Sequence, residues 1–194
     1  MNYKKGVLKA IIWIFIIGVA VSFFGYYYLK NTWDDFVTEK ELTEFVTKVK
    51  FAKELPDRFY QLYEKENPNI LSYGLNRQIF SGLFSSDFMK SPSLLAAMIS
   101  DISRKDTDST KISNRKAYTL AWKLEEETTQ KECLNWVLEN YKFDLYIHGI
   151  NEVANFYFKK EVSELSDREL NDIIALMKKP SIVSVPDRTD EGMR

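Results

Sequence analysis

The stretch TQKECLNWVLENY, from Thr129 to Tyr141, decides the fold class of this chain. Thr129 and Glu132 have the S/T-x-x-E spacing of a capping box, in which two side chains satisfy backbone N–H groups at the start of a helix. Leu134, Leu138 and Tyr141 follow at helical spacing and share one face. The stretch therefore predicts an amphipathic helix that packs on an apolar core.

Similar signals recur on both sides of this stretch. Ser166 and Glu169 form a second capping box, and Ser91-Pro92 places an N-cap residue and a first-turn proline ahead of an apolar run. The segment from Arg104 to Lys111 is polar throughout and predicts a loop. No convincing alternating strand is present. We expect an all-α domain with helices over 35–54, 57–66, 94–102, 113–127 and 130–141, and from Ser166 to Pro180.

The N-terminal segment has the character of a membrane anchor. Ala10 to Leu29 carries no charge, and at ~1.5 Å rise per residue it is long enough for a ~30 Å hydrocarbon core. Lys4, Lys5 and Lys9 precede it, so the positive-inside rule predicts a cytoplasmic N-terminus. We expect a cytoplasmic stub and anchor over residues 1–30, with the span at about 10–29, and one exported domain over 31–194.

A cleaved signal peptide is the alternative interpretation of this segment. The apolar run is long for a signal peptide, and no clear small-x-small cleavage site follows it. The sequence therefore favours an anchor that stays attached.

Composition excludes several classes of site. The chain of 194 residues has 27 basic and 28 acidic side chains, one cysteine and one histidine. We therefore expect no nucleic-acid partner, no internal disulfide, no metal site and no cofactor. We expect Cys133, the single cysteine, to be a buried packing residue. We expect His148, the single histidine, to be a helix cap or a surface residue. The run Glu125 to Glu127 at a helix end is typical of a solvated face.

A family resemblance extends from Ser113 to Pro186. Its motifs are A-x-x-L-E at Ala121 to Glu125, G-I-x-x-A-A at Gly149 to Ala154 (with valine for the first alanine), and Y-F-G-K at Tyr157 to Lys160 (with lysine for glycine). In this order and spacing the stretch resembles the peptidoglycan transglycosylase domain, glycosyltransferase family 51.

The resemblance implies a lysozyme-like helical fold outside the bacterial cytoplasmic membrane. It also implies lipid II, a lipid-linked disaccharide-peptide, as donor and a nascent glycan as the growing chain. Members of the family use one glutamate as general base and a second glutamate at the leaving group, with lysines and arginines near the pyrophosphate. Other cell-wall synthesis proteins are possible partners.

The catalytic positions of the family fall on unsuitable residues in this chain. The motif E-D-x-x-F overlays Leu55 to Phe59, which places the base position on Leu55 and leaves Glu54 as a weak candidate one residue earlier. The motif E-I-L-E-x-Y-L-N overlays Glu132 to Glu139, and its second glutamate becomes Asn135. Arg115 and Lys116 are the candidates for substrate binding. The polar stretch that contains them fits either a pyrophosphate or lipid-headgroup contact or a solvated loop.

Three hypotheses follow from the sequence. The favoured one is an anchored transglycosylase-like protein that has lost catalysis and binds lipid II, glycan or a partner. The second is an active but divergent transferase that uses Glu54 or another acid. The third is a structural membrane protein with only a generic helical resemblance to the family.

Overall fold

The computed structural model of the chain describes residues 2–82, 89–104, 114–144 and 146–178. Within these ranges no β-strand is present, and one isolated antiparallel bridge joins Lys142 to His148. The predicted all-α class is therefore confirmed. The helices are α1 (Asn2–Lys30), α2 (Glu39–Lys50), α3 (Asp57–Glu66), α4 (Leu75–Gly82), α5 (Pro92–Ile99), α6 (Asp101–Arg104), α7 (Asn114–Glu127), α8 (Gln130–Asn140), α9 (Gly149–Val153) and α10 (Asp167–Lys178).

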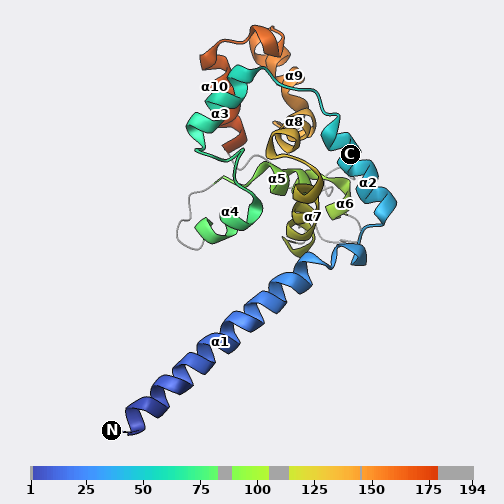
Figure 1. The fold of residues 1–194 in the computed structure, drawn as a ribbon. Helices are drawn as coiled ribbons and strands as arrows, with labels where there is room; N and C mark the ends of the chain where they lie inside the picture. Colours follow the sequence, from blue (N-terminus) through green and yellow to red (C-terminus); the bar gives the residue numbers. More distant parts are fainter. Residues whose placement is uncertain (1, 83–88, 105–113, 145, 179–194) are drawn as a thin grey trace, which may run out of the picture.

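Helix α5 lies at the centre of the domain and packs against both α7 and α8 (Figure 1). Its Leu94, Ala96 and Ala97 are buried, so this short apolar helix forms part of the core. Helix α2 and helix α9 pack on α8, whereas α10 packs on α3. The core is thus built by helices that surround α5 and α8. Helix α8 is the helix that the capping box of Thr129 and Glu132 predicted.

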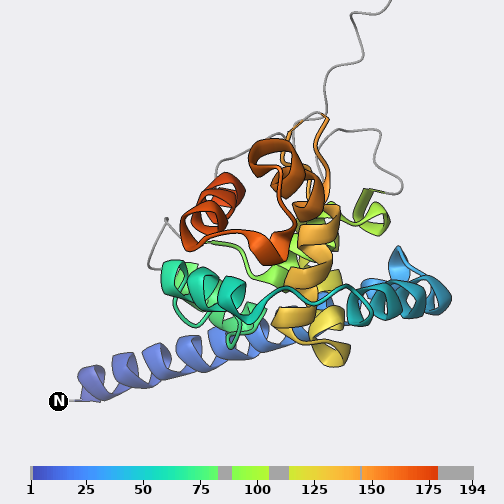
Figure 2. The same ribbon diagram turned by 90° about the horizontal axis from the view of Figure 1, so that it is seen from above.

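Helix α1 projects from this domain as a long rod (Figures 1 and 2). The most apolar 18 residues within its segment Gly6–Lys30 have a mean hydropathy of 2.5, and none of this stretch is buried inside the protein. The segment is long and apolar enough to cross a membrane.

Both predicted capping boxes are confirmed. The hydroxyl of Thr129 accepts from the N–H of Glu132 at 3.2 Å, while the carboxylate of Glu132 accepts from the N–H of Thr129 at 2.7 Å. The same reciprocal pair joins Ser166 and Glu169, at 3.4 and 2.6 Å. Helix α10 begins directly after Ser166 as a result, and the structure describes it as far as Lys178.

Two predicted helices have other boundaries in the structure. The helix expected over 35–54 is shorter because a third capping box, Thr38 with Glu41, starts α2 at Glu39, and a separate 3-10 turn covers Trp33–Asp35. The helix expected over 94–102 divides at Ser100, whose backbone is extended. Its hydroxyl bonds to the carbonyl of Ala97 at 2.8 Å, which caps α5 before α6 begins.

Three smaller differences complete the comparison with the expected helices. Tyr141 is buried with Leu134 and Leu138, but it lies just after α8 rather than inside it. Arg104 belongs to α6, and the remainder of the loop expected up to Lys111 lies outside the described residues, as do Ser113 and the segment after Lys178. A π-helical turn over Ala154–Phe158 has no counterpart among the predicted elements.

Candidate functional site

The two positions that the resemblance assigns to catalytic acids meet at one phenol. The N–H of Leu55 donates to the hydroxyl of Tyr60 at 2.9 Å. That hydroxyl donates in turn to Oδ1 of Asn135 at 2.6 Å. The segment before α3 and the inner face of α8 are therefore joined through Tyr60, and neither of the two positions carries a carboxylate.

Local sequence explains why Tyr60 points toward α8. Pro56 is the N-cap residue of α3, so Tyr60 falls in the first turn of that helix and faces back toward Leu55. Phe59 and Tyr63 are fully buried and their rings stack with centroids 6.1 Å apart, which fixes the rotation of α3. Asn135 is 3% exposed and lies among the buried residues of α8.

Burial keeps the bridging phenol neutral. Removal from water raises the pKa of Tyr60, and the hydrogen bond from Leu55 and the nearby charge of Lys131 offset this only in part. The ammonium of Lys131 lies 4.3 Å from the centroid of the Tyr60 ring and 4.0 Å from the carboxylate of Asp57. The junction therefore offers a neutral hydroxyl, a neutral amide and one cation.

Two carboxylates lie at the edge of this junction. Glu54, the weak catalytic candidate, is exposed, and its charge contributes to the raised pKa of Tyr60. Glu139 lies one helical turn after Asn135 on α8, and its Oε1 accepts from the N–H of Lys53 at 2.7 Å. Asn135 and Glu139 thus hold the 53–55 segment and Tyr60 against one face of α8.

Glu139 is a site residue that the sequence-based candidates left out, although a signal for it exists. In the motif E-I-L-E-x-Y-L-N, the second glutamate falls on Asn135 and the final asparagine falls on Glu139. Acid and amide have therefore exchanged places along one helix face, a turn apart. This exchange moves the carboxylate toward the solvent, because Glu139 is exposed and Asn135 is buried.

The candidate substrate-binding residues lie on another part of the domain. Arg115 forms an ion pair with Asp35 at 2.9 Å, and the ammonium of Lys116 lies 5.5 Å from the centroid of the Phe36 ring. Both side chains are thus held at the start of α7 against the segment that follows α1. The structure does not bring them to the Tyr60–Asn135 junction.

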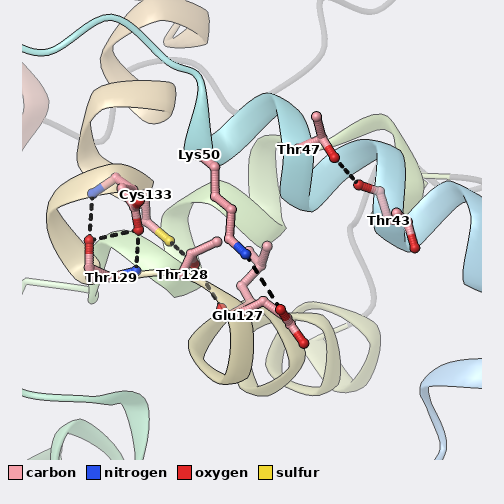
Figure 3. A network of polar contacts seen from close by, with 9 residues as sticks. Thr43, Thr47, Lys50, Glu127, Thr128, Thr129 and Cys133 are labelled. Carbon is pink, nitrogen blue, oxygen red and sulfur yellow. Dashed lines mark hydrogen bonds and ion pairs between the residues drawn. The ribbon is translucent and has the colours of Figure 1, made fainter.

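Glu125 corrects the expectation that residues 125–127 form only a solvated face. Its Oε1 accepts three hydrogen bonds, which come from different parts of the fold: the N–H of Leu75 at 2.7 Å, the hydroxyl of Ser93 at 2.7 Å and the amide of Gln130 at 2.6 Å. One carboxylate oxygen thus ties together α4, α5, α7 and α8. Glu126 and Glu127 are exposed but form ion pairs with Lys30 and Lys50, and Figure 3 shows the Glu127–Lys50 pair.

Cys133 and His148 have the environments that the sequence indicated. Cys133 is 1% exposed, its sulfur lies 3.2 Å from the hydroxyl of Thr128 (Figure 3), and burial raises its pKa to about 12. His148 is exposed at the N-cap of α9, where Glu152 accepts from its backbone N–H at 2.7 Å. In the described ranges of the chain, no three His, Cys, Asp or Glu residues gather in a way that could hold a metal ion.

Comparison with known proteins identifies the family to which the chain belongs. Comparisons with curated proteins and with solved structures found no match. A family model described as transglycosylase matches residues 94–194, just over half of the chain. The match includes α8 with Asn135 and Glu139, and it begins after the segment that holds Leu55 and Tyr60. A merely generic helical resemblance is thereby ruled out, and the chain belongs to the peptidoglycan transglycosylase family.

Proposed function

We propose that this chain is a membrane-anchored family member that serves peptidoglycan synthesis by binding rather than by catalysis. Its ligand would be lipid II, a nascent glycan or another wall-synthesis protein, on the outer side of the bacterial cytoplasmic membrane. The observation that carries the proposal is the junction at Tyr60, where Leu55 and Asn135 occupy the two positions that the family resemblance assigns to glutamates.

Chemistry supports the loss of transferase activity. A general base must be able to accept a proton within hydrogen-bond reach of the attacking hydroxyl. Leu55 contributes only its backbone N–H to the junction, and the amide of Asn135 cannot act as a base at physiological pH. A positioned general base contributes roughly 10²–10⁴-fold to a rate, so its absence alone would leave little turnover.

Anchoring is supported by α1 and by its attachment to the domain. Gly6–Lys30 is apolar and long enough to span a bilayer, and the lysines that precede the apolar run favour a cytoplasmic N-terminus. The ion pair between Lys30 and Glu126, at 3.0 Å, joins the end of this helix to α7. A helix that packs onto the folded domain favours an anchor over a leader peptide that is removed.

The alternative of an active, divergent transferase rests on the two carboxylates beside the junction. Glu54 precedes the position of the lost base by one residue, and Glu139 follows the position of the lost second acid by one turn. Both side chains are exposed and could reach a substrate that lies along the 53–55 segment. This alternative requires that one of the two carboxylates abstracts the acceptor proton.

A lipid II assay on the full-length chain in nanodiscs separates the two functions. We expect saturable binding of fluorescent lipid II, or of glycan strands, without formation of polymer. Polymer that disappears in Glu54→Gln or Glu139→Gln, but persists in the matched control Glu44→Gln on the exposed face of α2, would establish the active alternative. If the chain neither binds nor polymerises these ligands, another wall-synthesis protein is the proposed ligand that is left. Crosslinking of the native membrane complex then tests for this partner.

A further inference from the structure

The π-helical turn over Ala154–Phe158 presents two aromatic rings to solvent. Phe156 is 59% exposed and Tyr157 is 50% exposed, and their rings meet edge to face with centroids 5.0 Å apart. Ala154 is buried and Phe158 packs against the core, so both ends of the turn are fixed to the domain. A π-helical turn is rare and is frequently found at functional sites. The fold therefore holds the two rings outward in a defined place.

A strained lysine follows this turn. Lys159 has φ 55° and ψ 37°, the left-handed conformation that glycine adopts freely and that a Cβ atom disfavours. The Y-F-G-K motif of the family resemblance has glycine at this position. Lysine thus replaces the residue best suited to the backbone, and its ammonium lies 5.8 Å from the centroid of the Phe156 ring. Backbone strain of this kind is concentrated at functional sites, so it directs attention to the ammonium and the rings beside it.

The charge of Lys159 is not neutralised by the described parts of the fold. Its neighbour Lys160 is paired with Glu169 at 2.7 Å, whereas Lys159 forms no ion pair with another residue in the described ranges. Asn155, exposed on the same turn, adds an amide that can donate and accept hydrogen bonds. Two rings, one amide and one cation therefore share a short stretch, and we call the surface of Asn155, Phe156, Tyr157 and Lys159 the turn surface.

The turn surface lies away from the membrane helix. Figure 1 shows α9 and α10, the helices before and after the turn, at the end of the domain opposite to the end where α1 leaves. A bilayer that holds α1 is therefore not its natural ligand. Two rings are also few for a stable protein interface, in which each partner buries about 800 Å². The chemistry fits one repeating unit of a polymer better than it fits a folded partner.

We propose that the turn surface binds glycan strands of the assembled peptidoglycan, at residues separate from the Tyr60–Asn135 junction. The negative face of an aromatic ring attracts the C–H groups on the face of a sugar ring, and an ammonium attracts a carboxylate. Glycan strands of peptidoglycan offer both, because their muramic acid units carry a lactyl group that ends in a carboxylate or in an acidic peptide. The proposal rests on the proposed function above, which places the domain outside the cytoplasmic membrane.

Co-sedimentation with peptidoglycan sacculi tests the turn surface. The full-length chain in nanodiscs is mixed with sacculi that have been stripped of proteins and of acidic secondary polymers. We expect saturable sedimentation, with a dissociation constant about tenfold higher for Phe156→Ala and for Tyr157→Ala. The matched control is Phe51→Ala, which is 84% exposed at the end of α2 and should bind as the unmodified chain does. Equal binding of all four chains would overturn the proposal.

The variant Lys159→Gly separates recognition from folding. Glycine relieves the backbone strain, so the denaturation midpoint should not fall, whereas loss of the ammonium should weaken binding to sacculi at least about threefold. Chitin, a glycan without carboxylates, should bind the unmodified chain and Lys159→Gly equally weakly. A Lys159→Gly chain that binds sacculi as tightly as the unmodified chain would overturn the recognition of carboxylates by this surface.

Fluorescent lipid II, measured on the same chains, distinguishes this proposal from the one it rests on. Binding of lipid II without sedimentation on sacculi would overturn the turn surface and leave the proposed function standing. If the unmodified chain binds neither ligand, the turn surface is wrong together with the glycan-binding and lipid II-binding forms of the proposed function. A photocrosslinker at position 157 that captures a protein in cells, in a chain that does not bind sacculi, would indicate a protein occupant and would also overturn the proposal.

Discussion

The phenol of Tyr60 donates a 2.6 Å hydrogen bond to the side-chain oxygen of Asn135, inside the protein and across the junction between α3 and α8. Asn135 occupies the place of a glutamate in the motif that α8 resembles. An amide oxygen accepts this hydrogen bond as a carboxylate would, but it brings no charge into the interior and cannot take up a proton near neutral pH. Asparagine at this position therefore joins the two helices without an acid.

Replacement of Tyr60 by phenylalanine should destabilise the chain. The change removes one hydroxyl that serves two partners, and it leaves the Leu55 N–H and the buried Asn135 oxygen without their hydrogen bonds. We expect a loss of about 1–3 kcal/mol in the free energy of unfolding, measured by denaturant titration of the full chain in detergent. Tyr146→Phe, at an exposed loop position, is the control and should change the value by less than about 0.5 kcal/mol. Equal stability of the two variants would contradict a structural role for the Tyr60 bridge.

Glu125→Ala should cost more than the same change at its neighbour Glu127. Removal of the Glu125 carboxylate takes away the acceptor of three hydrogen bonds, from Leu75, Ser93 and Gln130, and opens space between four helices. We expect a loss of at least about 2 kcal/mol, against roughly 0–1 kcal/mol for Glu127→Ala, which breaks only the exposed ion pair with Lys50. Thermal unfolding of both variants in the same detergent measures the difference, and similar values for the two would refute the network.

Local signals account for the part of the fold that the sequence predicted. The capping boxes at Thr129 and Ser166 need only residues three positions apart, so the starts of α8 and α10 could be found without tertiary information. The environment of Glu125 shows what local signals cannot predict. The string Glu125-Glu126-Glu127 looks like a solvated helix end, because the groups that bury its first member come from α4, α5 and α8, far away in the chain.

The candidate site shows the same division. Asn135 could be placed because the motif around α8 is nearly gapless, and the family match covers it. The bridge through Tyr60 could not be predicted, since it depends on the rotation of α3, which Phe59 and Tyr63 set by packing in the core. The placement of Arg115 and Lys116 also depends on tertiary packing, because α7 holds them against Asp35 and Phe36.

The thiol of Cys133 should react with thiol reagents only when the chain unfolds, locally or as a whole. Burial raises its pKa to about 12, so the reactive thiolate is scarce at neutral pH, and the sulfur is closed off from reagent. We expect labelling by a thiol-specific disulfide reagent at pH 8 to be at least about 100-fold slower in the folded chain than in the chain unfolded in urea. Tyr146→Cys, on the exposed loop, serves as the control and should react at once in both states. Rapid labelling of Cys133 in the folded chain would show that the packing between α7 and α8 is looser than the structure indicates.

The carboxylate of Glu169 should make the free energy of unfolding of the chain decrease as the pH falls. The ammonium of Lys160, 2.7 Å away, and the hydrogen bonds from Ser166 lower the pKa of Glu169 to about 2, from an ordinary value of 4.5. Because the folded pKa lies below the unfolded one, the stabilisation is complete above about pH 4.5 and is lost as the pH falls toward 2. Glu169→Gln keeps an acceptor for the capping box and removes the charge. It should therefore lower the denaturation midpoint at pH 7, and the difference from the unmodified chain should disappear by about pH 2.

Asp172→Asn, at an exposed position of the same helix, is the matched control and should leave the midpoint nearly unchanged at both pH values. A Glu169→Gln chain with an unchanged midpoint at pH 7 would show that the Lys160–Glu169 pair does not support α10.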